Sequence, residues 1–276
     1  MGRTDGDCVG RAERVEVWST VGVFTAVAFV AAGVLGAAQP GTGVPDEVVQ
    51  LTQFGPALAV GGAALYRRRQ TRELLRGTGT RGGARSAGGV VLLGAAGLIV
   101  ALAVLGYDAV CGQVRFTPPG SLHHSFVLIA VAQLVGACEE EVGWRCYLQP
   151  LLRTRLGTVA SSVTVGVLWG AWHVPVFGQA PAYAAGFLAA TVAMSVVLGI
   201  ALEGVGGWRR LLLAGGFHAL VNLGLLLFMD EESGAVLPMV CFGLACLAVA
   251  VIVGALRAGW RAPDPAAPGP ATLHRT

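Results

Sequence analysis

Three groups of polar side chains interrupt the apolar stretches of this chain, and together they carry the chemistry of hydrolysis. The groups are Glu139–Glu141 with Arg145, then His173, and finally His218 with Asn222. An ionised side chain inside a membrane is costly unless it is paired or hydrated, so such residues mark a functional site by default. A buried carboxylate can act as a general base near neutral pH, and imidazole and amide groups can donate hydrogen bonds to an oxyanion.

The spacing within the first group assigns different roles to neighbouring carboxylates. Glu141 stands four residues before Arg145, which is the favourable order for an ion pair along a helix. Glu140 is turned by about 100° from Glu141 around the same helix, so its carboxylate can face the interior of a helix bundle without being neutralised by Arg145. We therefore expect Glu140 to be the general base and Glu141 to be the structural partner of Arg145.

The second group is expected to lie level with the first on a facing helix. The apolar segments 122–152 and 156–177 form an antiparallel pair around a turn near Thr154–Gly157 in this interpretation. Because the midpoint between Glu140 and His173 falls inside that turn, the two side chains lie at about the same height. His173 is then placed to help Glu140 activate a water molecule.

The third group shares one face of a single helix. His218 and Asn222 are four residues apart, and Gly215 and Gly216 just before them allow that helix to approach a neighbour closely. Both polar side chains are expected to donate hydrogen bonds to the oxyanion that forms at a peptide carbonyl. The three groups together predict a buried hydrolytic pocket.

The same side chains allow a metal-dependent alternative. Glu140, His173 and His218 can hold a zinc ion that keeps one position open for water. The sequence contains no HExxH, the helix-borne signature of many zinc proteases, and no GxSxG that would indicate a serine nucleophile. Purely structural roles also stay open, because polar residues often serve as contacts between membrane helices.

The composition predicts that helices in a membrane position these residues. Of 276 residues, 54% are hydrophobic and 13% are charged, against about 25% charged in soluble domains. This excludes a disordered chain, a coiled coil and an ordinary soluble enzyme. A spanning helix needs about 20 mostly apolar residues, and eight segments qualify approximately: 17–38, 48–66, 87–106, 122–152, 156–177, 182–203, 209–228 and 235–256. The expected fold is therefore all-α and polytopic, with the active site inside the bundle.

Charge and proline divide the chain into three parts. We expect an N-terminal segment at 1–16, a membrane domain at 17–256 whose motif-bearing core is 120–228, and a disordered tail at 257–276. Membrane proteins concentrate arginine in their cytoplasmic loops. With both termini in the cytoplasm, the cytoplasmic side receives every arginine except Arg115 and Arg145.

All 19 basic residues are arginine, which together with 41 glycines is typical of a GC-rich bacterial genome. The expected location is therefore the bacterial cytoplasmic membrane. A net charge of +3 that is concentrated on one side of a membrane requires no nucleic-acid partner.

The polar groups form three motifs that resemble those of a known family. Glu140–Arg145 resembles the EExxxR motif, although Cys146 stands where the family usually has glycine. Trp169–His173 resembles (F/W)xxxH, and His218–Asn222 resembles HxxxN/D. In this order and at this spacing, the chain is similar over 120–222 to the CPBP family (CAAX protease and bacteriocin-processing, also called Abi) of intramembrane proteases.

The resemblance implies an all-helical core of eight spans and endopeptidase activity within the membrane. It places Glu140, His173, His218 and Asn222 in the catalytic site, with a water molecule activated by glutamate and no required cofactor. Zinc or another divalent metal stays an alternative. The expected partners are a peptide or membrane-protein substrate and the lipid bilayer.

Two functions of other classes use the same polar cluster. One is a non-catalytic immunity or binding protein, which intact site residues disfavour. The other is an ion or proton transporter, because carboxylate and histidine chains also relay protons across membranes. A transporter requires polar residues along a whole path, whereas here they gather in one place, which favours a site.

Overall fold

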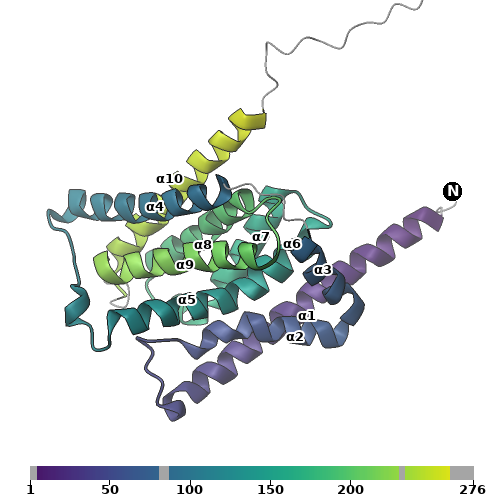
Figure 1. The fold of residues 1–276 in the computed structure, drawn as a ribbon, viewed down its shortest axis with the longest axis horizontal. Coiled ribbons are helices and arrows are strands. Elements are labelled where there is room, and N and C mark those ends of the chain that lie inside the picture. Colours follow the sequence, from purple (N-terminus) through teal and green to yellow (C-terminus); the bar gives the residue numbers. More distant parts are fainter. Residues whose placement is uncertain (1–4, 81–86, 230–233, 262–276) are drawn as a thin grey trace, which may run out of the picture.

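The computed structural model describes residues 5–80, 87–229 and 234–261, and the regular structure within these ranges is helical without any strand. This confirms the all-α prediction. Figure 1 shows the arrangement of the main helices. They are α1 (Asp5–Thr42), α2 (Gly55–Tyr66), α3 (Arg68–Thr80), α4 (Ala87–Cys111), α5 (Phe126–Gly143), α6 (Gln149–Arg153), α7 (Thr158–Trp172), α8 (Pro181–Ala201), α9 (Gly207–Phe228) and α10 (Val236–Arg261).

Five helices in the described ranges are long and apolar enough to cross a membrane: Glu16–Thr42 within α1, Gly88–Cys111 within α4, α8, α9, and Val236–Gly259 within α10. The chain is thus a polytopic α-helical membrane protein. The helix α7 is apolar but shorter, at 15 residues. The side of the membrane on which each terminus lies stays a prediction, and much of the expected tail, from 262 onward, lies outside the described residues.

The predicted total of eight spans is not confirmed, because two expected segments are interrupted. Segment 48–66 consists of a 3₁₀ turn, Leu51–Phe54, followed by α2, which has only 12 residues. Pro56 stands in the first turn of α2, where its missing N–H costs nothing. Segment 122–152 divides into α5, a π-helical turn η3 (Trp144–Leu148) and α6.

Pro150 gives a physical reason for the π-helical turn. In a regular α-helix its nitrogen would donate to the carbonyl of Cys146, but proline has no N–H and its ring clashes with that carbonyl. The backbone instead widens, so that the N–H of Gln149 donates to the carbonyl of Trp144, five residues earlier. Such turns are frequent at functional sites, and this one begins three residues after the last of the three carboxylates.

The helices α5 and α9, which carry Glu140 and His218, pack directly on one another. α9 contacts both α5 and α4, and lies between them in Figure 1. The close approach predicted at Gly215 is confirmed, since a Cβ there would lie 2.4 Å from Sγ of Cys138 on α5. Gly216 faces open space instead. The short turn between α6 and α7 lies at Thr154–Gly157, as the sequence predicts.

Candidate active site

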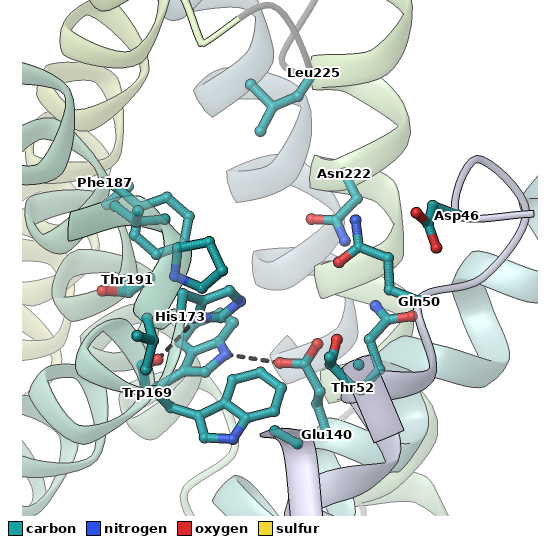
Figure 2. A pocket seen from close by; sticks show the side chains of 18 of the residues that line it. Asp46, Gln50, Thr52, Glu140, Trp169, His173, Phe187, Thr191, Asn222 and Leu225 are labelled. Carbon is teal, nitrogen blue, oxygen red and sulfur yellow. Dashed lines mark hydrogen bonds between the residues drawn. The ribbon is translucent and has the colours of Figure 1, made fainter. Parts of the chain in front are cut away.

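All four predicted catalytic residues line one cavity of about 880 Å³ inside the bundle. Glu140 comes from α5, His173 directly follows α7, and His218 and Asn222 come from α9. Figure 2 shows Glu140, Trp169 and His173 gathered at one end of this cavity, with Asn222 on the wall that faces His173. Residues 33 to 82 positions apart in sequence are thus brought together by helix packing.

The carboxylate of Glu140 is almost fully buried, with 2% of its surface exposed. Its Oε2 accepts a hydrogen bond of 2.7 Å from the indole nitrogen of Trp169. A neutral N–H holds the carboxylate in place without cancelling its charge, so its other oxygen stays available as a proton acceptor. The sequence analysis gave Trp169 no role, although the residue opens the second motif.

His173 is fixed by its own helix. Its Nδ1 lies 2.9 Å from the carbonyl oxygen of Trp169. Because a carbonyl only accepts, Nδ1 carries the proton in this contact and the neutral ring presents Nε2 as an acceptor. The expected helix to 177 is too long, since α7 ends at Trp172. Pro175 disfavours helical backbone before it, which leaves His173 at the helix end.

Glu141 contacts two charged or chargeable groups and does not line the cavity. Its Oε2 lies 3.3 Å from Nε of Arg145, which confirms the predicted ion pair, and both side chains are fully buried. Its Oε1 lies 3.2 Å from Nδ1 of His218, a contact that the sequence did not predict. The carboxylate therefore orients the His218 ring and stabilises its protonated form, in which Nε2 is a hydrogen-bond donor.

Arg145 is held by its surroundings more than by hydrogen bonds. Its guanidinium lies 4.6 Å from the ring centroid of Trp169, which is a cation–π distance. Within the described residues, none of its three side-chain nitrogens has a partner in hydrogen-bond geometry, so its contact with Glu141 is a charge contact. Trp169 thus touches both carboxylate systems, with its N–H on Glu140 and its face on Arg145.

Arg210 stabilises the π-helical turn from outside. The carbonyl of Arg145 has no backbone donor, because the N–H of Gln149 is taken by Trp144 and Pro150 has none. Nε of Arg210 donates to this carbonyl at 2.8 Å, and its Nη2 donates to Oε1 of Gln149 at 3.0 Å. Sequence analysis placed Arg210 only as a cytoplasmic charge.

The amide of Asn222 is partly engaged. Its Nδ2 donates to Oε1 of Gln133 on α5 at 3.3 Å, and Gln133 also lines the cavity. A side-chain amide has two N–H donors, so one stays available for a bound group. Gln133 was not among the predicted site residues, because nothing in its local sequence distinguishes it from a helix–helix contact.

The predicted metal ligands do not form a compact set. Within the described residues, no three His, Cys, Asp or Glu side chains are grouped closely enough to hold a metal ion. Glu140, His173 and His218 line the same cavity, but the Nδ1 atoms of both rings are bound to protein oxygens. Only their Nε2 atoms could face a metal.

A second acidic group lies at the edge of the same cavity. Glu47, which lines it, accepts hydrogen bonds from the backbone N–H of His123 at 3.1 Å and from Nδ1 of His124 at 2.9 Å. The hydrogen bond from His124 is the largest of the effects that lower the pKa of Glu47. This contact ties the segment after α1 to the segment before α5.

Comparison with known proteins places these residues in a family. Residues 122–224 match the family model for type II CAAX prenyl endopeptidases, described as Rce1-like. Over this stretch the chain resembles the CPBP family. The stretch contains Glu140, His173, His218 and Asn222, so the resemblance stated from the three motifs is confirmed.

The named relatives of this chain are distant. It is 24% identical over 155 residues to lysostaphin resistance protein A of Staphylococcus epidermidis, covering 56% of this chain and 40% of that one. It is 26% identical over 144 residues to CAAX prenyl protease 2 of Methanococcus maripaludis, and this match covers 48% of this chain and 52% of that protein. A 28% identical relative, lysostaphin resistance protein A of Staphylococcus aureus, is covered over 29% of its length. The matched region thus spans about half or less of each relative.

Proposed function

We propose that this protein is an intramembrane endopeptidase that hydrolyses peptide bonds with a water molecule activated by Glu140. The observation that supports this most strongly is the buried Glu140 carboxylate, held by a neutral N–H at one end of a cavity that also receives His173 and His218. A cavity of about 880 Å³ has room for a short extended peptide segment.

In the proposed first step, a water molecule lies between Glu140 and His173. Glu140 takes one of its protons while Nε2 of His173 accepts a hydrogen bond from the other, and the resulting hydroxide attacks the peptide carbonyl. The carbonyl oxygen becomes an oxyanion that accepts hydrogen bonds from Nε2 of protonated His218 and from Nδ2 of Asn222.

In the second step, the tetrahedral intermediate collapses. The C–N bond breaks, and protonated Glu140 returns its proton to the departing amine, which restores the carboxylate. Glu141 does not exchange protons with substrate in this scheme. It keeps the His218 ring oriented and charged, as a buried carboxylate does for a catalytic histidine.

We propose that no tightly bound metal is required, because Glu140 and the two rings already supply a base and an oxyanion donor. If a divalent ion does bind, Glu140, His173 and His218 would hold it, and it would supply a polarised water. Purified protein treated with a chelator and then with one equivalent of zinc tests this. Activity unchanged by the chelator is expected, and loss followed by stoichiometric recovery would contradict the proposal.

The proposed function is tested by comparing the peptides of membrane proteins in cells that carry wild-type protein, Glu140→Gln or Glu139→Gln. Glu139 neighbours the proposed base but does not line the cavity, so its variant is a matched control. New N-termini that are present with wild type and Glu139→Gln, and absent with Glu140→Gln, are expected. Identical N-termini in all three would contradict an endopeptidase.

A non-catalytic binding protein is the second candidate, because two relatives are named for resistance to lysostaphin. Such a protein would need the cavity but not the base. Glu140→Gln would then preserve the cellular phenotype, whereas a variant that fills the cavity, such as Ala190→Trp, would abolish it. Loss of the phenotype in both variants is expected from the endopeptidase.

A further inference from the structure

The cavity is rich in acceptors and poor in cations. Its described lining includes three carboxylates, Asp46, Glu47 and Glu140, and it includes no arginine. The sequence contains no lysine. The groups of this lining that can become positive are the rings of His173 and His218, and both serve the proposed catalysis. A bound group with a negative charge would therefore meet carboxylates with no fixed cation to balance them.

The acceptors on one wall are only partly satisfied within the described residues. Glu47 is bound to His123 and His124, but no partner is found for the exposed carboxylate of Asp46. Gln53, with 7% of its surface exposed, has an Oε1 that accepts no hydrogen bond. Unpaired acceptors along a cavity favour a ligand that brings donors.

The two sides of the cavity suit an extended peptide. Figure 2 places Asp46, Gln50 and Asn222 on one side, and His173 and Phe187 on the other. Side-chain amides both donate and accept, so they can pair with a peptide backbone. The lining also includes apolar residues that can receive apolar side chains, among them Phe187, Met194, Leu225 and Phe242.

The acidic end of the cavity lies away from the arginine-bearing turns at the other end of α8. Its lining residues Asp46, Gln179 and Gly234 come from the segments that follow α1, α7 and α9. Arg153 and Arg257 both contact Glu203, beyond the other end of α8, where α7 begins. Arg115 follows α4 near the end of α9, where the N–H of Thr117 donates to the carbonyl of Leu227, but it is not part of the described lining. Asp46 and Glu47 are the carboxylates of the described lining at this end.

We infer that the substrate of this site is a peptide segment that carries a positive charge, placed against Asp46 while the adjoining apolar residues fill the cavity. The charge is a basic side chain or a free N-terminal amine, since both are cationic nitrogen donors. A segment that ends in a free carboxylate inside the cavity is disfavoured. This inference rests on the proposed function, because it names the substrate class of the same site.

The test uses internally quenched peptides of one apolar sequence in which a single position, scanned along the peptide, is Lys, Gln or Glu. A further pair has a free or an acetylated N-terminus and no other charge. Full-length protein in detergent is assayed for kcat/KM, and the Glu140→Gln protein is assayed for binding of the same peptides by fluorescence anisotropy. The lysine scan and the N-terminal pair separate the two sources of the charge.

At the best position we expect Lys to be preferred over Gln, and Gln over Glu, by about three- to fivefold each at low salt, as for one water-exposed charge pair. The preference should shrink at 1 M NaCl, where the Debye length is about 3 Å. Asp46→Asn should remove it and Asp46→Arg should reverse it. Asp108→Asn, which removes a carboxylate outside the described cavity lining, should keep it.

Equal handling of Lys and Glu peptides at every position, or a preference that Asp46→Arg leaves unchanged, would overturn the inference. If none of these peptides binds and none is cleaved, the inference is overturned as well. If the Lys peptide binds best but none is cleaved by wild-type protein, the proposed peptidase fails while the charge preference stands.

Discussion

Glu140 and Glu141 are adjacent in sequence, yet they lie in opposite surroundings. Glu140 lines the cavity and is held by one neutral indole N–H. Glu141 lies outside the described cavity lining, between Arg145 and His218. The comparison shows how a step of one residue along a helix separates a carboxylate available for proton transfer from one whose charge is already paired with neighbouring groups.

The largest expected effect is a loss of stability when the ion pair of Glu141 with Arg145 is broken. Glu141→Ala or Arg145→Ala leaves an uncompensated buried charge and should destabilise the protein by about 3–5 kcal/mol, with loss of cleavage. Thermal unfolding in detergent measures the change. The double variant Glu141→Ala with Arg145→Ala should lose less stability than the losses of the two single variants added together. Full additivity would show that the pair does not interact.

His218 contacts both the Glu141 pair and the cavity, since Glu141 contacts its Nδ1 and its ring lines the cavity. His218→Ala should lower kcat by about 10²–10³ with a much smaller change in KM, because an oxyanion donor acts mainly in the transition state. Steady-state kinetics on the quenched peptides measures both constants. A rise in KM at constant kcat would assign His218 to substrate binding instead.

Trp169 also contacts both groups, Glu140 through its N–H and Arg145 through its ring face. Different substitutions remove one contact or both. Trp169→Phe removes the N–H that holds Glu140 but keeps an aromatic face beside Arg145. It should lower kcat about tenfold, as expected for one lost hydrogen bond to a charged group, with little change in unfolding temperature. Trp169→Leu should lower both. Equal unfolding temperatures for the two variants would argue against the cation–π contact.

The smallest effect is expected at the cavity edge, where Glu47 contacts His123 and His124. Because these contacts lower the pKa of Glu47 below that of an ordinary glutamate, their stabilisation is present above the unfolded pKa and is lost as pH falls through the lower, folded pKa. Glu47→Gln should therefore lower the unfolding temperature slightly at pH 6, and this difference should disappear as pH falls through the folded pKa. A difference that is constant with pH would contradict the assignment.

Local spacing predicted part of this site and could not predict the rest. The i,i+4 rule was sufficient for Glu141 with Arg145, and the turn at Thr154–Gly157 lies where the sequence predicted it. Glu140 and His173 line the same cavity. The contact of His218 with Glu141 depends on how α9 is rotated against α5, which no local pattern encodes.

The π-helical turn is a second feature that the sequence could not predict. Pro150 signals that a regular helix is interrupted, but not that the backbone widens while continuing in the same direction. The carbonyl that this turn releases is bound by Arg210, which is 65 residues away in sequence and looked like an ordinary cytoplasmic arginine. The predicted total of eight spans is not confirmed for a similar reason, since hydropathy does not reveal such interruptions.

The most direct test of the different roles of the two carboxylates compares Glu140→Gln with Glu141→Gln, using cleavage of the quenched peptides and thermal unfolding in detergent. Glu140→Gln should abolish cleavage while its unfolding temperature stays near that of wild type, because an amide oxygen can still accept the Trp169 hydrogen bond. Glu141→Gln should unfold at a clearly lower temperature. A stable but inactive Glu141→Gln protein beside a normally active Glu140→Gln protein would contradict the account and reverse the two roles.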